Sequence, residues 1–418
     1  MCNLILSLFI FMFGHSSLEV SAQPPAPPPA QPPHALVTSL HKDPNTSLHT
    51  ITVTLNPSDQ YLVDLDGPII WNRCDSQHYT SSIEDPMCST ARSYMSPLCP
   101  ETNNTYSYIC YDTPVNPITG SCALSYLTRN TFTIHWTYGR SLSEYSMEYN
   151  ERAVSCAPSS LLQSLPEQAI GVAPLSWSPL SLRDQCFPPF NLAARKFSLC
   201  LSSSSDHQGV FFIGDGPYYL EPPANFDASS VLSFTPLIKS PTKLGYFINV
   251  TGISIDQQAI KVPANAFALD VNGGVKLSTT VPYTTLRRDI YSVFVSEFKK
   301  ALKGIHRGKR VSPLDFCFMM NVTQQKADSS IPRIDLALGD GGYWTIHESN
   351  LLKQMDNDVA CLAFIDGGNT AEHAIVIGTH QMENIMLQFD WADSILGFSS
   401  ALSSYGSSCG NFDFTVRP

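Results

Sequence analysis

The sequence predicts an all-β protein that consists of two related lobes. From residue 35 onward, short runs rich in Val, Ile, Thr, Phe and Tyr alternate with clusters of Pro, Gly, Ser and Asn, a pattern typical of strands joined by turns. An internal repeat indicates the two lobes, because an apolar strand ending in Gly follows two separate turns at nearly the same distance along the chain. These pairs are Asp64 with Gly171 and Ser278 with Gly378.

The individual elements follow from the same patterns. The clearest helix is expected at 286–303, where Ile290, Phe294 and Phe298 form an apolar stripe opposite Lys and Arg. Shorter helices are expected near 159–164 and 379–384. Strands are expected where β-branched and aromatic residues gather, at 50–55, 131–138, 209–213, 246–255 and 374–377.

The first residues predict export of the protein. Residues 4–13 are apolar except for Ser7, and Val20-Ser21-Ala22 has the small residues of a cleavage site. The apolar run is too short to span a bilayer, so we interpret residues 1–22 as a secretory signal. Residues 23–34 form a Pro-rich leader, which is expected to be extended because Pro cannot donate regular backbone hydrogen bonds.

The rest of the chain is divided into two predicted lobes. Residues 35–220 are assigned to the N-terminal lobe and residues 221–418 to the C-terminal lobe. The boundary is placed where Pro217, Pro222 and Pro223 interrupt the strand pattern.

Cysteines and glycan acceptors fit an exported protein. The chain has 12 cysteines, and removal of the signal with Cys2 leaves an odd number, so at least one thiol is expected to be unpaired among the disulfides. Asn-x-Ser/Thr motifs predict glycan acceptors at Asn45, Asn103, Asn249 and Asn321.

Charge and motifs exclude several classes of ligand. A net charge of −11 with 25 Lys and Arg residues argues against nucleic acid or an anionic membrane as a partner. The basic run at 299–310 is interpreted as a solvated helix end and loop. No Cys-x-x-Cys and no His-x-x-x-His occurs, and the oxygen ligands of a calcium loop are missing after Gly67. We therefore expect no metal and no cofactor.

Two turns determine the interpretation of function. In residues 61–74 an apolar strand leads to Asp64 and the turn Asp66-Gly67-Pro68, as in one active-site arm of an aspartic protease. In residues 275–286 the corresponding acid position is Ser278. Such a protease needs two carboxyl groups that share one proton, because only then do an acid and a base together activate water. Serine cannot share that proton.

The motifs around these turns resemble those of a plant protein family. The chain is similar to the TAXI-type xylanase inhibitors, extracellular dermal glycoproteins and basic 7S globulins, which share an all-β, pepsin-like (acid protease) bilobal fold with two β-barrel-like lobes and a few short helices. The resemblance rests on Asp-Leu-x-Gly-Pro-x-x-Trp-x-x-Cys at 64–74, Leu-Ser-Thr-x-x-Pro-Tyr at 277–283, Leu-Arg-x-Asp-x-Tyr at 286–291, Arg-Lys-Phe-Ser-Leu-Cys at 195–200 and Gly-x-x-Gln-Met-Glu-Asn at 378–384.

The resemblance implies a disulfide pattern and a set of contact residues. It implies pairs of Cys74 with Cys156, Cys200 with Cys409, and Cys317 with Cys361; local pairing of Cys88, Cys99, Cys110 and Cys122; and an unpaired Cys186. It also implies that partner proteins are contacted by the loops 307–313 and 402–408, with the candidate residues Arg307, Val311, Ser312, Pro313, Ser404 and Tyr405. Ordinary surface loops are the alternative interpretation of these segments.

Three hypotheses of function remain. The first is an inactive binding protein that inhibits microbial glycoside hydrolases in the plant apoplast or cell wall. The family's xylanase-blocking His precedes the last cysteine, whereas residues 401–409 contain no His. The target is then another hydrolase than a family 11 xylanase, such as a xyloglucan-specific endoglucanase, or no hydrolase at all.

The second hypothesis is an atypical aspartic protease that recruits Asp66 or Asp270 beside Asp64. The third is a storage or stress globulin or a peptide-binding cell-wall protein.

Overall fold

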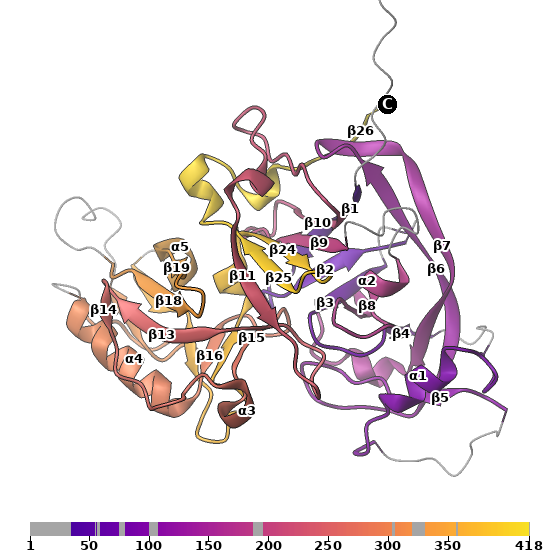
Figure 1. Cartoon of the computed structure of the whole chain (residues 1–418), viewed down its shortest axis with the longest axis horizontal. Helices are drawn as coiled ribbons and strands as arrows, with labels where there is room; N and C mark the ends of the chain where they lie inside the picture. The colour runs from indigo at the N-terminus through magenta and orange to yellow at the C-terminus, as the bar shows by residue number, and fades with distance from the viewer. Residues whose placement is uncertain are drawn as a thin grey trace, which may run out of the picture. The chain divides into compact units, whose positions relative to one another are not determined.

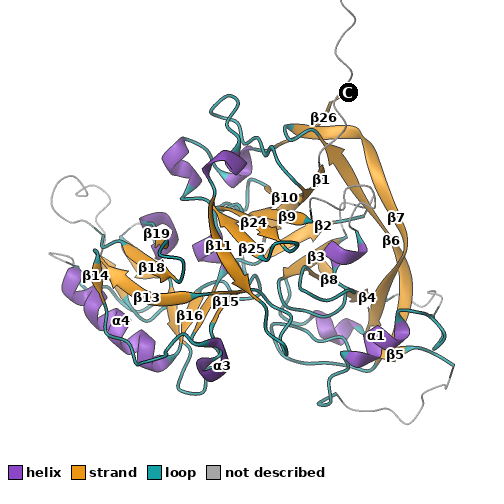
Figure 2. Cartoon of the chain, in the orientation of Figure 1, coloured by secondary structure: helices purple, strands orange, loops and turns teal. Residues whose placement is uncertain are grey.

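The described chain is mostly β-strand with a few short helices, which confirms the predicted fold class (Figure 1, Figure 2). The computed structural model describes residues 35–417, apart from 55, 57–58, 75–79, 100–107, 187–194, 303–305, 320–330 and 357. The predicted signal and Pro-rich leader lie outside the described residues. Among the helices that are described, none is long and apolar enough to cross a membrane.

The first half of the chain contains the longest hairpin of the described residues, which β6 and β7 form. In β6, Phe132, Ile134 and Trp136 stand at alternating positions and are buried, as on the covered face of a half-buried strand. The strands are β1 (Ala35–Lys42), β2 (His49–Thr52), β3 (Gln60–Asp64), β4 (Trp71–Arg73), β5 (Tyr111–Asp112), β6 (Ser125–Thr137), β7 (Ser141–Ala157), β8 (Ala169–Pro174), β9 (Lys196–Cys200) and β10 (Gly209–Gly214).

The second half has shorter strands. They are β11 (Ser233–Ile238), β12 (Phe247–Ile248), β13 (Val250–Ile255), β14 (Gln258–Ala259), β15 (Val275–Leu277), β16 (Thr284–Leu286), β17 (Cys317–Met319), β18 (Ile334–Leu338), β19 (Tyr343–Ile346), β20 (Leu352–Gln354), β21 (Val359–Leu362), β22 (Phe364–Asp366), β23 (Ile375–Ile377), β24 (Met386–Asp390), β25 (Ile395–Phe398) and β26 (Asp413–Arg417). The α-helices of both halves are α1 (Cys88–Ser93), α2 (Leu182–Gln185), α3 (Leu269–Asn272), α4 (Arg288–Ala301), α5 (Glu348–Leu351) and α6 (Thr379–Met382).

The predicted elements correspond to observed ones. The helix expected at 286–303 is α4, and the segment near 379–384 contains α6. The segment near 159–164 forms one 3₁₀ turn, Ser159–Leu162, and not an α-helix, because Pro158 and Pro166 limit its length. The strands expected at 50–55, 131–138, 209–213, 246–255 and 374–377 overlap β2, β6, β10, β12 with β13, and β23.

Strands from the two halves of the chain meet in one sheet. β9 pairs with β10 on one side and with β24 on the other, and β25 joins β24 to β11 (Figure 1). On this sheet, Phe197 of β9 stacks on Phe389 of β24 with ring centroids 4.6 Å apart, and Tyr246 meets Phe389 at 4.7 Å. The buried aromatic rings therefore hold the two halves together. The predicted boundary at 220 and 221 falls between β10 and β11 and stays a prediction.

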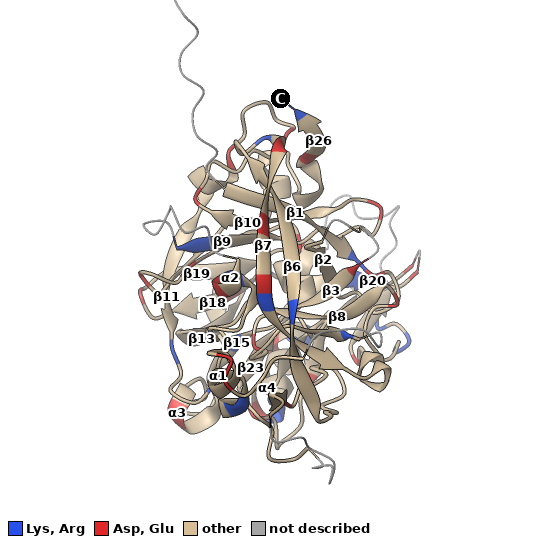
Figure 3. Cartoon of the chain, turned by 90° about the vertical axis from the view of Figure 1, so that its right-hand side faces the viewer, with Lys and Arg blue, Asp and Glu red and all other residues tan. Residues whose placement is uncertain are grey.

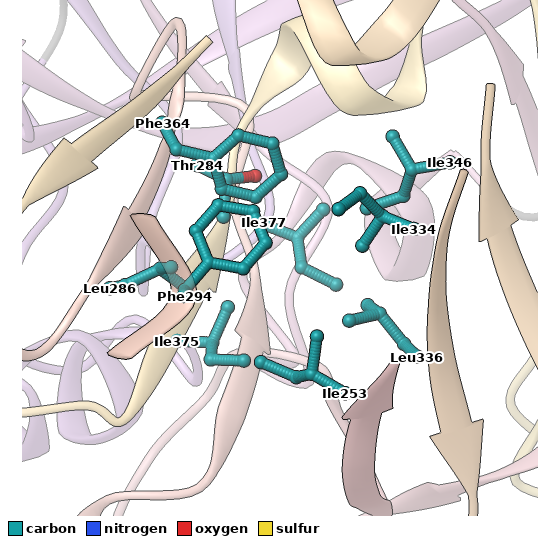
Figure 4. A pocket seen from close by; sticks show the side chains of 10 residues that line it. All are labelled: Ile253, Thr284, Leu286, Phe294, Ile334, Leu336, Ile346, Phe364, Ile375 and Ile377. Carbon is teal, nitrogen blue, oxygen red and sulfur yellow. The ribbon is translucent and has the colours of Figure 1, made fainter. Parts of the chain in front are cut away.

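The second half has its own apolar core beneath α4. The ring centroids of Phe294 in α4 and Phe364 in β22 are 4.8 Å apart, and isoleucines from several strands surround the two rings (Figure 4). The space that remains between these side chains is about 10 Å³, which is room for about one water molecule. This cavity is a packed core and not a ligand site.

The structure contains the disulfide pairs that the resemblance implied. The bonds are Cys74–Cys156, Cys200–Cys409, Cys317–Cys361, Cys88–Cys110 and Cys99–Cys122. Within the described part of the chain, the cysteine outside these bonds is Cys186; it is buried, and burial raises the pKa of its thiol above the usual range. Such a thiol is unreactive.

Charged residues are sparse on the face shown in Figure 3. Lys and Arg are scattered there among Asp, Glu and a large majority of uncharged residues.

Candidate functional site

The two turns singled out in the sequence have the same local architecture. β3 runs parallel to β8 and ends at Asp64, and β15 runs parallel to β23 and ends just before Ser278. In each lobe the strand that leaves the turn pairs antiparallel with the crossing strand, β4 with β8 and β16 with β23. The internal repeat of the sequence is therefore a repeat of structure.

The glycines of the repeat allow the crossing strand to approach closely. A Cβ atom at Gly171 would lie 1.9 Å from the carbonyl oxygen of Trp71, and one at Gly378 would lie 2.6 Å from the carbonyl carbon of Tyr283. Any side chain at these two positions would push the crossing strand away from the arm. The glycines thus fix the positions of Asp64 and Ser278.

Asp64 is buried and held by the backbone of its own turn. Asp64 is only 4% exposed. The Asp66 N–H donates a hydrogen bond to the Asp64 Oδ1 at 2.9 Å. The Leu175 N–H donates to the Asp64 carbonyl at 2.7 Å and ties the turn to the end of β8. The carboxyl group is well oriented but poorly solvated.

The surroundings of Asp64 favour its protonated form. Burial, and next the negative charge of Asp66, raise the pKa of Asp64 to about 6. The backbone N–H groups of the turn and the charge of Lys276 oppose this rise. In a mildly acidic medium the group is therefore a neutral carboxylic acid.

This pKa shift predicts the effect of Asp64→Asn on stability. A carboxyl with a pKa raised to about 6 stabilises the fold fully below its unfolded pKa of about 3.8, and this contribution is lost as pH rises through 6. The uncharged Asn avoids the loss, so we expect the variant to be more stable than the wild type at pH 8 by about 3 kcal/mol and nearly equal at pH 3.5. Thermal unfolding at both pH values tests this, and a variant that is destabilised at pH 8 would contradict it.

Ser278 lies where the sequence predicts the second acid position. It is 5% exposed, its N–H donates to the Ile377 carbonyl at 2.9 Å, and its Oγ lies 3.0 Å from Thr280 Oγ1. The Thr280 N–H also donates to this Oγ, at 3.2 Å. The hydroxyl is thus held within its own turn and carries no charge.

Contacts between the two turns bring Asp64 and Ser278 together. The Thr279 hydroxyl donates a hydrogen bond to the Val63 carbonyl at 2.7 Å. The residues next to Ser278 and Asp64 are therefore hydrogen-bonded to each other across the two lobes. Leu65 is the counterpart of Thr279 in the first turn. It is buried, and because it has no hydroxyl it cannot donate the equivalent hydrogen bond to the second turn. Lys276 of β15 instead forms an ion pair with Asp66.

Activation of water by an acid–base pair needs two carboxyl groups, and the prediction of a displaced acid named two candidates besides Asp64. Asp66, a candidate for a displaced acid, is paired with Lys276. Asp270, the other candidate, lies in α3 and lines an open surface pocket of about 360 Å³ together with Lys243, Glu372 and His373. The sequence did not reveal that Lys276 and Thr279 contact the first turn. A single Lys in an apolar strand and a Thr in a Ser-Thr-Thr run were the only signs of these contacts.

The predicted contact residues lie in two surface loops. In the loop 307–313, the backbone of Arg307 pairs antiparallel with the backbone of Phe318. Val311 is half-buried, and Ser312 and Pro313 are exposed. In the loop 402–408, Ser404 and Tyr405 are exposed. Within the part of the chain that the structure describes, no hydrogen bond, ion pair or ring contact joins these two loops.

The loop 402–408 has neighbours that the sequence did not reveal. Tyr405 stacks on Phe226 with ring centroids 5.5 Å apart. The exposed His207 packs against the chain beyond this loop, since a Cβ atom at Gly410 would lie 2.8 Å from His207 Cβ. The disulfide Cys200–Cys409 brings these segments together. An imidazole therefore lies close to the last cysteine although residues 401–409 contain none.

Other predicted sites have simpler outcomes. Asn45 and Asn249 are exposed, whereas Asn103 and Asn321 lie outside the described residues, so glycosylation stays a prediction. Among the described residues no group of three or more His, Cys, Asp and Glu side chains is placed to hold a metal ion.

Comparison with protein families identifies the group to which these features belong. The N-terminal domain of the xylanase inhibitors matches residues 50–215, and their C-terminal domain matches residues 245–400. The chain belongs to this TAXi family. The matches include both Asp64 and Ser278.

Relatives in this TAXi family carry different names. The chain is 32% identical to chitinase CLP of Oryza sativa subsp. japonica, over 91% of this chain and 92% of that protein. It is 32% identical to probable aspartic proteinase GIP2 of Nicotiana benthamiana, over 84% of this chain and 85% of that protein. The crystal structure of conglutin gamma, a basic 7S globulin from lupine seeds, is 30% identical, has a TM-score of 0.78 and is matched over 92% of this chain and 100% of that one.

Proposed function

We propose that this TAXi-family protein is a secreted, catalytically inactive binding protein that inhibits microbial cell-wall-degrading glycoside hydrolases. The observation that supports the proposal is that Asp64 and Ser278 are both buried, with a carboxyl group on the first and a hydroxyl at the position that we assign to the second acid. In an aspartic protease one carboxyl group acts as the acid and the other as the base. A single carboxyl group cannot fill both roles at once. The fold is then a scaffold for binding.

The loss of catalysis extends beyond one residue. Leu65 lacks the hydroxyl that Thr279 provides in the other turn, and Lys276 neutralises Asp66, the nearest alternative acid. The substitution Ser278→Asp alone would therefore not supply the hydroxyl that Leu65 lacks or release Asp66 from Lys276. These features support an inactive scaffold over a protease with a displaced acid.

The surface near the last cysteine supports binding of a protein. Tyr405 is 37% exposed and is held by its stacking on Phe226, and the exposed His207 lies against Gly410. Rigid aromatic side chains lose little conformational entropy when a partner binds, so they are frequent at the energetic centres of interfaces. An imidazole at the same surface can hydrogen-bond to carboxylates such as those in a glycoside hydrolase active site.

The test is inhibition of purified hydrolases. The wild-type protein is titrated into microbial xylanases of families 10 and 11, and xyloglucan-specific endoglucanases, and their activity is measured. We expect inhibition of at least one enzyme and a loss of affinity of about tenfold or more for both His207→Ala and Tyr405→Ala. Tyr343→Ala, which changes an exposed tyrosine of β19, serves as the matched control and should inhibit like the wild type.

Two results would contradict this proposal. One is the absence of inhibition of every enzyme in the panel, and the other is unchanged inhibition by both variants. The first result favours the globulin alternative, which the similarity to conglutin gamma supports. A storage protein would form no stoichiometric complex with a hydrolase.

Export of the protein is part of the same proposal. The disulfides of the described chain form in oxidising compartments such as the secretory pathway. Residues 1–22 are proposed to be the signal that directs the chain there, and the final destination is proposed to be the apoplast or cell wall.

A further inference from the structure

Three titratable side chains meet inside the fold, where β1 and β2 pack against the residues that follow α6. β1 pairs antiparallel with β2, and Lys42 stands directly opposite His49 in this pairing. His49 is fully buried, and Lys42 forms a buried ion pair with Glu383, with 2.7 Å between Nζ and Oε1. An ammonium group, an imidazole and a carboxylate therefore share one interior region.

Lys42 and His49 hold consecutive carbonyl groups of one segment. Lys42 Nζ donates to the Ser203 carbonyl at 2.9 Å, and His49 Nε2 lies 3.0 Å from the Ser202 carbonyl. Because a carbonyl oxygen only accepts hydrogen bonds, Nε2 carries the proton of the neutral ring. The other ring nitrogen, Nδ1, is then a buried acceptor to which no described residue donates.

Uptake of a proton at this Nδ1 would disturb the charge balance of the region. The other titratable groups that face Glu383 come from three further segments, and they are Tyr283, Lys353 and His380. His380 Nδ1 lies 3.5 Å from Glu383 Oε2, and Lys353 is half-buried. A charged His49 would thus add a buried cation beside Lys42, with Glu383 as the carboxylate that they share. Like charges directly opposite each other on neighbouring strands are destabilising.

Asn384 connects this region to the loop 402–408. Its N–H donates to the Leu201 carbonyl at 2.8 Å, directly before the two carbonyl groups described above. Its own carbonyl accepts from the Leu402 N–H at 2.9 Å, and its Oδ1 accepts from the Cys409 N–H at 3.1 Å. Asn384 therefore holds both ends of the loop.

From this chain of contacts we infer that protonation of His49 loosens the loop 402–408 and releases a partner bound to it. A charged imidazole opposite Lys42 would weaken the packing of β1 and β2 on residues 201–203. The contact between Leu201 and Asn384, and with it the anchoring of the loop, would weaken next. Release of a hydrolase rests on the proposed function, whereas loosening of the loop does not.

The burial of His49 sets the direction of the pH dependence. Burial lowers the pKa of His49 below its usual 6.5, and the charge of Glu383 and the hydrogen bond with Ser202 oppose this fall only in part. A group with a lowered pKa in the folded state gives stability that is complete above its unfolded pKa. This stability is lost as pH falls from 6.5 through the folded value, so the loop is anchored near neutral pH and loosened in acid.

Hydrogen–deuterium exchange of the free protein tests the loosening from pH 7 to pH 4, after correction for the intrinsic effect of pH on amide exchange. In the wild type we expect the protection of residues 380–384 and 402–408 to fall in acid by about threefold or more relative to α4. His49→Gln keeps an N–H donor for the Ser202 carbonyl but takes up no proton, so it should retain this protection. His306→Gln makes the same change at an exposed position and should follow the wild type.

The effect on a partner is measured separately. A hydrolase that the wild type inhibits at pH 7 should bind more weakly in acid, and His49→Gln should lose less affinity over the same pH range. If no hydrolase is inhibited at any pH, the proposed function fails, while the exchange of the free protein still decides whether His49 controls the loop.

Two outcomes would overturn the inference. One is unchanged protection of residues 402–408 in the wild type between pH 7 and pH 4, and the other is an equal loss of protection in the wild type and in His49→Gln. If His49→Gln fails to fold, NMR titration of His49 in the wild type replaces it. The midpoint of this titration should coincide with that of the loop's exchange, and separate midpoints would contradict the control of the loop by His49.

Discussion

Replacing Lys42 by Met is expected to destabilise the protein by about 3–5 kcal/mol at pH 7, which is the cost of leaving a buried charge without its partner. Lys42 Nζ lies 2.7 Å from Glu383 Oε1, and the two side chains are only 6% and 4% exposed. Lys42 is on β1 and Glu383 follows α6, so this ion pair links the first and second halves of the chain. The variant leaves the buried Glu383 carboxylate without its direct ion-pair partner, and only the weaker charge interactions with groups such as His380, His49 and Lys353 remain.

The pH dependence of this effect follows from the carboxyl group. Although burial raises the pKa of Glu383, the hydrogen bond from His380 and the charge of Lys42 hold it below its usual value. A depressed pKa gives stability that is present above the unfolded pKa and is lost as pH falls through the folded one. The difference between wild type and Lys42→Met should therefore shrink in acid, where Glu383 is protonated.

Chemical and thermal unfolding at pH 7 and pH 4 measure this difference. Lys243→Met breaks an exposed ion pair with Glu372 and is the matched control, with an expected cost below about 1 kcal/mol. The double variant Lys42→Met with Glu383→Leu should recover much of the lost stability, since no unpaired charge remains. Equal stability of Lys42→Met and the control variant would contradict a structural role for the buried pair.

The second large effect is expected from Asp112→Asn, which should stabilise the protein at pH 8 by about 4 kcal/mol. Asp112 of β5 is 1% exposed, and although the Ser155 hydroxyl donates to its Oδ1 at 2.8 Å, no described residue donates to its Oδ2. Burial raises the pKa of Asp112 to about 7. Its contribution to stability is complete below about pH 3.8 and is lost as pH rises through 7, when the buried group must ionise.

Unfolding curves from pH 4 to pH 8 test this prediction. The wild type should lose stability across this range, and Asp112→Asn should lose less. Asp206→Asn removes an exposed carboxyl and should follow the wild type. A variant that is less stable than the wild type at pH 8 would show that the ionised carboxylate makes a favourable contact, contrary to this explanation.

The sequence was sufficient for the fold class and the main elements because they follow from local patterns. The stripe of Ile290, Phe294 and Phe298 predicted α4, and strand-and-turn alternation predicted β2, β6, β10, β12, β13 and β23. The repeat of Asp64 with Gly171 and Ser278 with Gly378 located the two central turns. Short elements such as α1 and α5 escaped prediction, since they have too few residues to show a period.

What could not be predicted depends on contacts between distant segments. Lys42 and Glu383 each look like solvent-exposed charges in the sequence, and only the fold brings them together in the interior. The same holds for His207 beside Gly410, which the disulfide Cys200–Cys409 places there. Asp112 in a short strand gave no sign of burial, because β5 is too brief to show alternation.

We propose that Asp64 is the one carboxyl group at the two acid positions, so the two turns form no acid–base pair. The most direct test is a proteolysis assay of the purified protein at pH 3 to 6 on an unfolded protein substrate, with and without pepstatin, and with Asp64→Asn as the matched variant. We predict no pepstatin-sensitive cleavage and no difference between the wild type and Asp64→Asn. Cleavage that pepstatin blocks and that Asp64→Asn abolishes would contradict the claim, and would show that another acid works beside Asp64.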